Sequence, residues 1–492
     1  MIMYKSEKLV QHIKQLIENG SYSANTKLPS LRAQAQVTGY SLMTILNAYQ
    51  TLIAEGRVYS KEKSGFFISE YNYNTYQKTN TVETSQPQKI KINSKVFSYL
   101  KQTQASDYIY FSSAFPDEQC LYNTKIMKIL AHYAQQKPIG TTNKNMPPGN
   151  LKLRQQIANR YILQGIPTQA DDIIITSGAL DALNLALQTL TQTGDYILLQ
   201  DTIFYGAWQA AERLGLQVIT LPTHPQYGFN LQAFEDLLQA YPIKVCSFML
   251  NSHNPIGFTV NDKIKEKIAS LLEKYQVYLI EDDTYQELYY FGQKPLPMCY
   301  FEHQNRVLHC SSFSKVLGAN IRIGWVRTET FSEKIQHLQL MSTLAANTLI
   351  QETLANFIAT PYYDKHLQKL RKQLYQRKNL LYHLLLRYLP SSCHIHYYSS
   401  GYFLWIELPN HLNSTALFQI LLSQNIGITP SHLFSIHEVP HNYIRINSSF
   451  HMDSQHKQAI ISLAHAIKYL IYQRMPALLH YFKTDSNAFR RL

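Results

Sequence analysis

Long apolar runs are missing from this chain of 492 residues. No stretch is both apolar and long enough to cross a bilayer. The first residues carry Lys5, Glu7 and Lys8, where a secretion signal would need an apolar segment. These absences argue against a membrane protein and against an exported one, so we expect a cytoplasmic protein with no membrane partner.

Cysteine is also scarce, with five residues that are scattered along the chain and odd in number. None of them shows the spacing of metal ligands, and the set does not form a disulfide framework. Buried or half-buried thiols in a reducing compartment are the simplest interpretation, and we expect no metal. The five are Cys120, Cys246, Cys299, Cys310 and Cys393.

Acidic residues are outnumbered, 33 against 46 lysines and arginines, which leaves a formal net charge of +13. A basic chain fits an acidic partner such as nucleic acid, although charge alone decides nothing. The chain is too long for one compact core, and 45% hydrophobic residues suit a globular protein. We therefore look for two or more domains.

The first seventy residues have the outline of a winged helix-turn-helix. Leu9, Val10 and Ile13 lie on one stripe of a first helix. Ser30 can cap a short second helix, and Ser41 opens a third. Short extended segments at 58–60 and 66–68 then flank a polar hairpin tip.

Several motifs of this region resemble the GntR-type DNA-binding domain: Lys27-Leu28-Pro29-Ser30-Leu31-Arg32, Thr44-Ile45, Ala48-Tyr49, Glu55-Gly56 and Gly65-Phe66-Phe67-Ile68. The resemblance implies binding of double-stranded DNA, with helix side chains at base edges and wing lysines at phosphates. Leu42 departs from the family, which usually has an arginine there. By position the implied DNA contacts are Arg32, Ser41, Met43, Thr44, Lys61, Lys63 and Ser64. A protein-interaction module of the same outline stays open as the alternative.

The chain then divides into further parts. Residues 71–95 are polar without a sustained apolar period, which predicts a flexible linker after a first domain at 1–70. Residues 96–475 alternate helices with short apolar strands, which predicts an α/β domain with a mainly parallel large sheet and a smaller C-terminal α+β part. Residues 476–492 form a tail with no assigned role.

Polar residues follow the carboxyl ends of successive strands in this large domain, where open α/β sheets bind ligands. Ser177-Gly178-Ala179 turns into a helix and offers backbone N–H groups to an anion. Lys315 stands in a small-residue loop between two strands, with Arg322 beyond it. A lysine there can form a Schiff base with a carbonyl cofactor, and a guanidinium can hold a phosphate. An ordinary solvated lysine is the competing interpretation.

Together these motifs resemble the fold type I pyridoxal-phosphate enzymes, specifically the class I aminotransferases, over most of residues 96–472. The resemblance implies that Lys315 forms the Schiff base, that Asp282 pairs with the pyridine nitrogen, and that Arg445 clasps a substrate carboxylate. It further implies that Asn254 and Tyr285 hydrogen-bond the ring oxygen and that Phe204 stacks on the ring. The implied phosphate group is Ser177, Gly178, Ala179, Ser312 and Arg322. From the residues alone, Glu281 and Asp283 compete with Asp282, and Arg445 could be an ordinary strand-end arginine.

A GntR-like domain ahead of an aminotransferase-like domain resembles the MocR family of bacterial transcriptional regulators. The resemblance implies a homodimer whose large domain binds pyridoxal 5′-phosphate and a small amino compound as effector or substrate. Two other functions stay open: a working aminotransferase with a vestigial DNA-binding domain, and a scaffold whose cofactor is structural.

Overall fold

The computed structural model describes residues 5–18, 26–54, 57–61, 64–69, 86–103, 108–136, 146–224, 228–290, 293–436 and 442–472. The chain divides into two compact units. The first unit holds Met1–Glu83 together with the short segments Tyr290–Gln293 and Tyr397–Ser399. The second holds the large α/β part, Thr84–Tyr289, Lys294–His396 and Ser400–Leu492. Each unit is described by itself. The domain boundaries drawn from the sequence stay a prediction.

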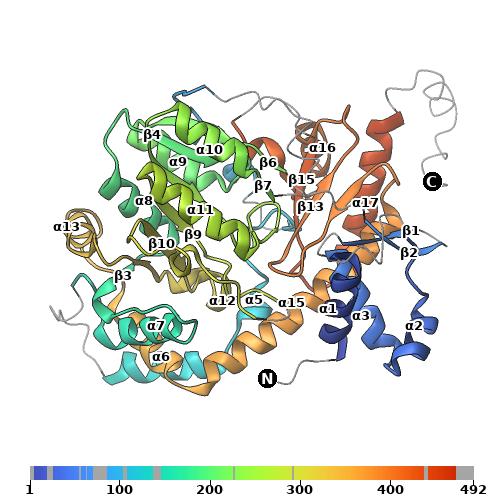
Figure 1. Cartoon of the computed structure of the whole chain (residues 1–492), viewed down its shortest axis with the longest axis horizontal. Coiled ribbons are helices and arrows are strands. Elements are labelled where there is room, and N and C mark those ends of the chain that lie inside the picture. The colour runs from blue at the N-terminus through green and yellow to red at the C-terminus, as the bar shows by residue number, and fades with distance from the viewer. Residues whose placement is uncertain are drawn as a thin grey trace. The chain divides into compact units, whose positions relative to one another are not determined.

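The described residues of the small unit form three helices and a hairpin (Figure 1): α1 (Lys5–Glu18), α2 (Leu31–Thr38), α3 (Leu42–Ala54), β1 (Val58–Lys61) and β2 (Gly65–Ile68). The two strands pair in antiparallel fashion. As the sequence predicts, the Ser30 side chain caps α2 by accepting a hydrogen bond from the Ala33 N–H at 3.2 Å. Gly39, with a φ of 68°, ends that helix in the left-handed region that favours glycine.

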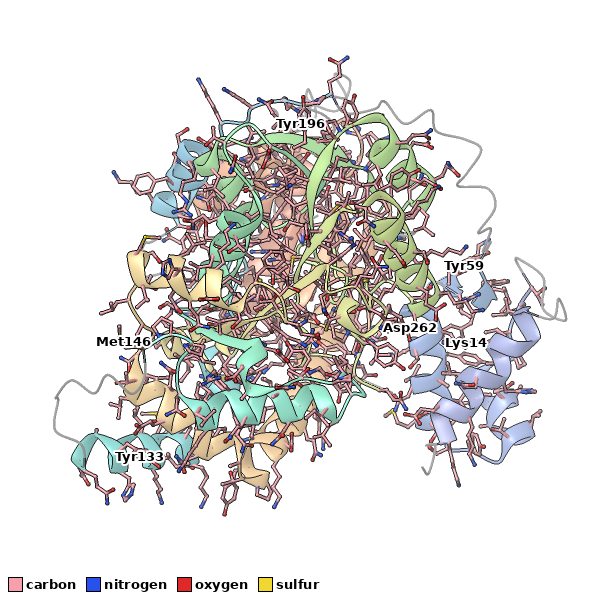
Figure 2. The ribbon with its side chains drawn as sticks, turned by 60° about the vertical axis from the view of Figure 1, so that its left-hand side comes forward. Lys14, Tyr59, Tyr133, Met146, Tyr196 and Asp262 are labelled. Carbon is pink, nitrogen blue, oxygen red and sulfur yellow. The ribbon has the colours of Figure 1, made fainter. Side chains whose placement is uncertain are left out.

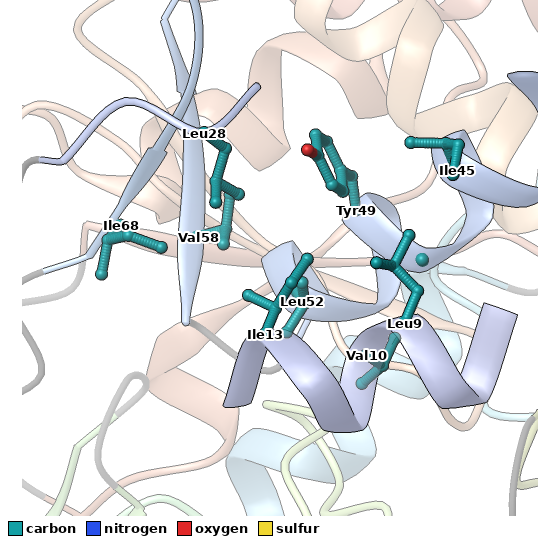
Figure 3. Packing of buried hydrophobic residues seen from close by; sticks show 10 residues of the cluster. Leu9, Val10, Ile13, Leu28, Ile45, Tyr49, Leu52, Val58 and Ile68 are labelled. Atoms are coloured by element: carbon teal, nitrogen blue, oxygen red, sulfur yellow. The ribbon is translucent and has the colours of Figure 1, made fainter. Parts of the chain in front are cut away.

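An apolar core holds the small unit together (Figure 3). Every third or fourth residue of α1 and α3 is apolar, so each helix turns one apolar face inward. The Tyr49 hydroxyl donates to the Pro29 carbonyl at 2.9 Å and ties α3 to the turn before α2. The buried members are Leu9, Val10, Ile13, Leu28, Ile45, Ala48, Tyr49, Leu52, Val58 and Ile68.

Among the described residues of the large unit, the main sheet has seven strands. All neighbours are parallel except β11, which runs antiparallel to β10 and β3, so the prediction of a mainly parallel sheet is confirmed. The order is β3 (Ile173–Thr176), β11 (Gly324–Arg327), β10 (Val307–Ser312), β9 (Tyr278–Asp282), β8 (Ile243–Phe248), β4 (Tyr196–Gln200) and β5 (Gln217–Leu221). A short ladder of β6 (Thr223–His224) and β7 (Gly228–Phe229) follows β5.

Helices surround this sheet, and side chains fill the space between the layers (Figures 1 and 2). Helix α8 packs on β9, β10 and β11, and α7 packs on β3. The helices up to the end of the sheet region are α4 (Asn93–Gln102), α5 (Glu118–Leu121), α6 (Thr124–Gln136), α7 (Leu151–Ile162), α8 (Ala179–Leu190), α9 (Tyr205–Leu214), α10 (Leu231–Ala240), α11 (Asp262–Tyr275), α12 (Ser314–Leu317) and α13 (Ser332–Ser342).

The C-terminal part is built on an antiparallel sheet in the order β12 (His394–His396), β13 (Phe403–Glu407), β15 (Tyr443–Asn447) and β14 (Thr429–Pro430). Its helices are α14 (Thr348–Ile358), the long α15 (Pro361–Tyr388), α16 (Ser414–Leu422) and α17 (Ser454–Tyr472). The small α+β part expected from the sequence is therefore present. No helix among the described residues is apolar and long enough to cross a membrane.

Part of the expected linker is structured. Gln88 pairs with Val218 of β5, and Ile92 is buried. The N–H groups of Ile92 and Asn93 donate to Glu212 Oε2 at 2.5 and 2.8 Å. These residues pack on the large unit because apolar side chains alternate with the polar ones there. Residues 70–85 and the tail at 476–492 lie outside the described residues.

Candidate functional site

Lys315 is buried at the start of α12, directly after β10, where the sequence predicted a loop. Its side chain is 9% exposed, so it is not the solvated lysine of the competing interpretation. The Nζ atom donates to the Ala114 carbonyl at 2.8 Å and lies 3.9 Å from the centre of the Phe115 ring. Burial, reinforced by the positive charge of Arg445, lowers the pKa of this ammonium to about 7.

Asp282 ends β9 and is separated from its two acidic neighbours by the alternation of a strand. Its Oδ1 accepts hydrogen bonds from the N–H of Thr284, at 3.2 Å, and from the Thr284 hydroxyl. Burial raises the pKa of Asp282, and the charge of Lys315 opposes that shift. Glu281 and Asp283 are fully buried. Of the three acids, Asp282 is the one whose charge acts on the pKa of Lys315.

Glu281 and Asp283 belong to a buried polar network that sequence reasoning missed. Trp325 Nε1 donates to the Tyr161 hydroxyl at 2.9 Å, and that hydroxyl lies 2.6 Å from His309 Nδ1. The other ring nitrogen, Nε2, lies 3.1 Å from Asp283 Oδ2.

A lysine supplies the positive charge of this network. Lys265 is fully buried and donates to Asn251 Oδ1 at 2.7 Å and to the Leu296 carbonyl at 2.6 Å. Asn251 in turn donates to Asp283 Oδ2 at 3.1 Å. Burial, together with the charge of Asp283, raises the pKa of Glu281 to about 8. Glu281, Asp283 and His309 lie close enough to share a cation. Burial lowers the pKa of Lys265, and the charges of Glu281 and Asp283 oppose that shift.

Tyr285, Asn254 and Arg445 form a second hydrogen-bonded chain, beside Lys315. The Nδ2 of Asn254 donates to the Tyr285 hydroxyl at 3.2 Å, and Arg445 Nη1 donates to Asn254 Oδ1 at 2.9 Å. Lys315 Nζ lies 5.5 Å from the centre of the Tyr285 ring. Burial raises the pKa of Tyr285, which keeps its hydroxyl protonated. The structure thus brings together four residues that are far apart in the sequence.

Arg445 lies in the middle of β15 and is 1% exposed, unlike an ordinary strand-end arginine. Its Nη2 donates to the Ser112 carbonyl at 2.8 Å and to Thr429 Oγ1 at 3.2 Å, and its guanidinium lies 4.3 Å from the centre of the Phe403 ring. Its Nε has no hydrogen-bond partner, and no described carboxylate lies within ion-pair distance. A buried cation without a counter-ion is costly, so the site suits an anionic ligand.

The N-terminus of α8 forms a cradle with Arg322. Arg322 Nη2 donates to the Ser177 carbonyl at 2.8 Å. Gly178 has a φ of 110°, and a Cβ there would lie 2.8 Å from Arg322 Nη2. The N–H of Ser177 donates to Asp181 Oδ2 at 2.8 Å. Ala179 begins the helix, so its free N–H and the positive end of the helix dipole lie beside the guanidinium.

Two further candidates flank these groups. Ser312 is the last residue of β10, is 5% exposed and pairs with Gly324 of β11. Phe204 is half-buried directly before α9, with its ring centre 4.5 Å from that of Tyr205. The ring of Phe204 packs against Tyr205, and its stacking role on the cofactor stays a prediction.

This donor set fits pyridoxal phosphate. It offers a buried amine, a carboxylate, and a guanidinium beside a helix N-terminus with a glycine that leaves room for close approach. The sequence reading missed Thr284, which fixes the Asp282 carboxylate, and Phe115, whose ring covers the Lys315 amine. A hydroxyl residue two positions after a strand-end aspartate is a turn signal that could have singled out Thr284. Phe115 has no local signal.

The residues expected to meet DNA lie on the small unit. Arg32 of α2 is exposed, and Met43 of α3 is 65% exposed. Ser41 Oγ accepts from the Thr44 N–H at 3.2 Å and lies 2.8 Å from Thr44 Oγ1, so these hydroxyls cap α3. At the wing tip the Ser64 N–H donates to the exposed Lys61 carbonyl at 2.9 Å. Lys63 lies outside the described residues. The DNA-contacting roles stay predictions.

Comparisons with known proteins agree with both units. The family model of bacterial regulatory proteins of the gntR family matches residues 5–68, and that of aminotransferase class I and II matches residues 120–463. The chain is 40% identical over 466 residues to the HTH-type transcriptional regulator YdcR of Escherichia coli (strain K12), covering 95% of this chain and 99% of the relative. It is 29% identical to YjiR of the same organism, covering 94% and 99%.

Solved structures support the fold of the large unit. The multiple substrate aminotransferase of Thermococcus profundus superposes with a TM-score of 0.71 at 23% identity, covering 77% of this chain and 96% of that one. The predicted fold class is confirmed, and pyridoxal phosphate is confirmed as the cofactor of the aminotransferase family. The regulator prediction is confirmed by the relatives that share both domains. The chain belongs to the MocR-type family of transcriptional regulators, in which a GntR-type winged helix-turn-helix domain precedes a class I and II aminotransferase domain.

Proposed function

We propose that this regulator binds double-stranded DNA through its small unit and changes that binding when a small amino compound with a carboxylate enters the site between Lys315 and Arg445. The observation that carries the proposal is Arg445, a buried guanidinium with no described carboxylate partner, joined through Asn254 to Tyr285 beside the Lys315 amine. An α-amino acid offers an amine and a carboxylate, the two groups that this pair of residues suits.

The cofactor would be held by residues of this chain with separate tasks. Lys315 would attach its carbonyl carbon, Asp282 would receive the pyridine nitrogen, and Asn254 with Tyr285 would hold the ring oxygen. Ser177, Gly178, Ala179, Ser312 and Arg322 would hold the phosphate, and Phe204 would stack on the ring. When bound, the cofactor supplies an electrophilic carbon and a ring that withdraws electrons.

Thr284 supports the proposed role of Asp282. Its hydroxyl and N–H both donate to the same carboxylate oxygen, which fixes the plane of the carboxylate and leaves the second oxygen for the ligand. Asp282 must be charged to hold a protonated ring nitrogen, and the cation of that ring would oppose the burial that raises its pKa.

We further propose a homodimer that acts in the cytoplasm, where the DNA of a bacterial regulator lies. Two-fold symmetry would present two small units to two half-sites of an operator. A ligand changes this presentation only if it binds one arrangement of the units better than another. The large unit would therefore couple occupancy near Arg445 to the spacing of the two heads.

A footprint of the full-length protein on its own promoter region tests the proposal. Protection should require cofactor and should change when α-amino acids are added. The corresponding amines, which lack the carboxylate, should have no effect. In Arg445→Lys the amino-acid response should need roughly tenfold more ligand, because a point charge replaces the bidentate fork. Cofactor-independent protection that no amino compound alters would refute the proposal.

Transamination is the second candidate, and one observation favours it. With a pKa of about 7, much of Lys315 is uncharged at neutral pH and can take up a proton from a substrate. A relative named aromatic-amino-acid aminotransferase, from Thermococcus litoralis, is 26% identical over 76% of this chain. Turnover of about 1–1000 s⁻¹ with an amino acid, together with no salt-resistant DNA binding, would favour this candidate over the regulator.

A further inference from the structure

Three large apolar side chains are exposed around the turn between α2 and α3. Val37 is 81% exposed, Leu42 50% and Met43 65%. We call these three residues the reading patch. Leu42 and Met43 are exposed in the first turn of α3, whereas the rest of this helix is buried in the core through Ile45 and Tyr49 (Figure 3). The small unit's own core therefore does not cover the patch, and an exposed cluster of this kind marks a binding surface.

Charges around the reading patch favour DNA over a protein partner. From Thr26 to Ala54 the chain has two cations, Lys27 and Arg32, and no Asp or Glu. Lys5 Nζ lies 5.6 Å from the centre of the Tyr40 ring, next to the N-terminus of α3. A polyanion can approach this face without repulsion from carboxylates, and the nearby cations can contact its phosphates.

The composition of α3 limits which bases it can recognise. None of its residues from Leu42 to Ala54 is charged, so this helix cannot make the arginine or lysine contact that reads guanine. Leucine and methionine offer no hydrogen bond. The one apolar group on the major-groove edge of the base pairs is the C5-methyl of thymine.

The amide of Asn47, on the same face of α3 as Met43, also favours A·T pairs. Asn47 is half-buried one turn after Met43, so both lie on the face opposite the core. Asparagine can donate to and accept from the major-groove edge of adenine. A thymine methyl against Met43 and an adenine against Asn47 would together select A·T pairs.

Resting on the proposed DNA-binding function, we propose that α3 reads A·T pairs in the major groove, with Leu42 and Met43 packed against thymine methyl groups. Specificity at these positions would then come from apolar contact and from the Asn47 amide.

Selection from a random duplex pool, followed by removal of single methyl groups, tests this inference on the full-length protein with pyridoxal phosphate. The enriched duplex should contain A·T pairs at the centre of each protected half-site. Replacing each contacted thymine by uracil should weaken binding about three- to fivefold, the loss expected for one buried methyl. Uracil outside the protected bases should leave affinity unchanged.

Variants assign the effect to the reading patch. In Leu42→Ala, uracil in place of the thymine that Leu42 contacts should no longer weaken binding, because the contacting side chain is already gone. Met43→Ala should do the same for the thymine that Met43 contacts. Leu42→Arg should shift the selected base towards guanine. Leu163→Ala, which removes an 84% exposed leucine of the large unit, is the control and should keep the full uracil effect.

The outcomes separate this inference from the function on which it rests. A pool with no enriched duplex would refute sequence-specific DNA binding itself. An enriched duplex that binds equally well with uracil would leave the regulator standing and overturn the thymine assignment. A uracil effect that persists in both alanine variants would also overturn it, because other residues would then contact the methyl groups.

Discussion

The two units place their functional side chains in opposite environments. In the small unit the core is apolar and the residues expected to meet DNA, such as Arg32 and Met43, are exposed. In the large unit the residues expected to meet the cofactor, such as Lys315 and Arg445, are buried among polar partners. A long, charged, polymeric ligand would meet exposed side chains, whereas a small ligand would be enclosed by buried ones. The difference teaches that burial changes the chemistry of a residue only in the second case, as the lowered pKa of Lys315 illustrates.

The largest expected effect is loss of cofactor attachment in the large unit with no change in the small unit. Lys315→Ala should abolish the visible absorbance of protein-bound pyridoxal phosphate, because among the described residues Lys315 supplies the amine of the site. Non-specific DNA binding by the small unit should be unaffected. Lys365→Ala, an exposed lysine of α15, is the control and should keep the band. An unchanged band in Lys315→Ala would mean that another lysine carries the cofactor.

The converse change targets the small unit's core. Leu52→Ala should lower the free energy of unfolding of that unit by about 2–5 kcal/mol, because it leaves a cavity in a small apolar core. Leu52 is fully buried, whereas Leu42 of the same helix is 50% exposed, so Leu42→Ala should change stability by less than about 0.5 kcal/mol. Thermal unfolding of both variants measures this. Loss of the cofactor band in Leu52→Ala would show that the units do not fold separately.

A pH effect is expected in the large unit. Lys378 is fully buried and donates to the Ser400 carbonyl at 2.8 Å. Burial lowers the pKa of its ammonium from 10.5 to about 7. Between these two values the unfolded chain binds the proton and the folded one does not. Raising the pH through this window therefore stabilises the fold by up to about 1.4 kcal/mol per pH unit.

Lys378→Met should remove this contribution. Unfolding midpoints at about pH 7.5 and pH 9 should differ less in the variant than in the parent. Lys315 contributes with the same sign in cofactor-free protein, so part of the pH dependence should remain. The exposed Lys365→Met is the control. A pH dependence identical in Lys378→Met and the parent would contradict the shifted pKa.

The smallest expected effect lies on the wing. Lys61 is exposed at the end of β1, and a phosphate contact there adds one released counter-ion. Lys61→Ala should reduce the slope of log affinity against log salt by about 0.9 without changing the preferred sequence. Titrations of one duplex at several salt concentrations measure it. A changed base preference would instead place Lys61 in a groove.

The sequence was sufficient for elements whose ends carry a local signal. Ser30 predicts the start of α2 because its hydroxyl can replace a missing helical partner, whereas the choice of Asp282 among three neighbouring acids rests on the resemblance and stays a prediction. The buried network of Lys265, Asp283 and His309 could not be predicted, because its hydrogen bonds join residues of different elements. No local pattern shows that the Ala114 carbonyl meets Lys315, since 201 residues separate them.

Strand β9 has one more consequence. The carboxylates of Glu281 in β9 and of Asp283 just after it contact buried partners, the Met298 N–H and His309, while Asp282 between them is held by Thr284 and coupled to Lys315. Inserting or deleting a single residue within β9 would exchange the two sides, burying the middle carboxylate and turning its neighbours outward. A substitution in β9 would alter a single side chain, whereas a change in the length of the strand would move the side chains of both of its faces.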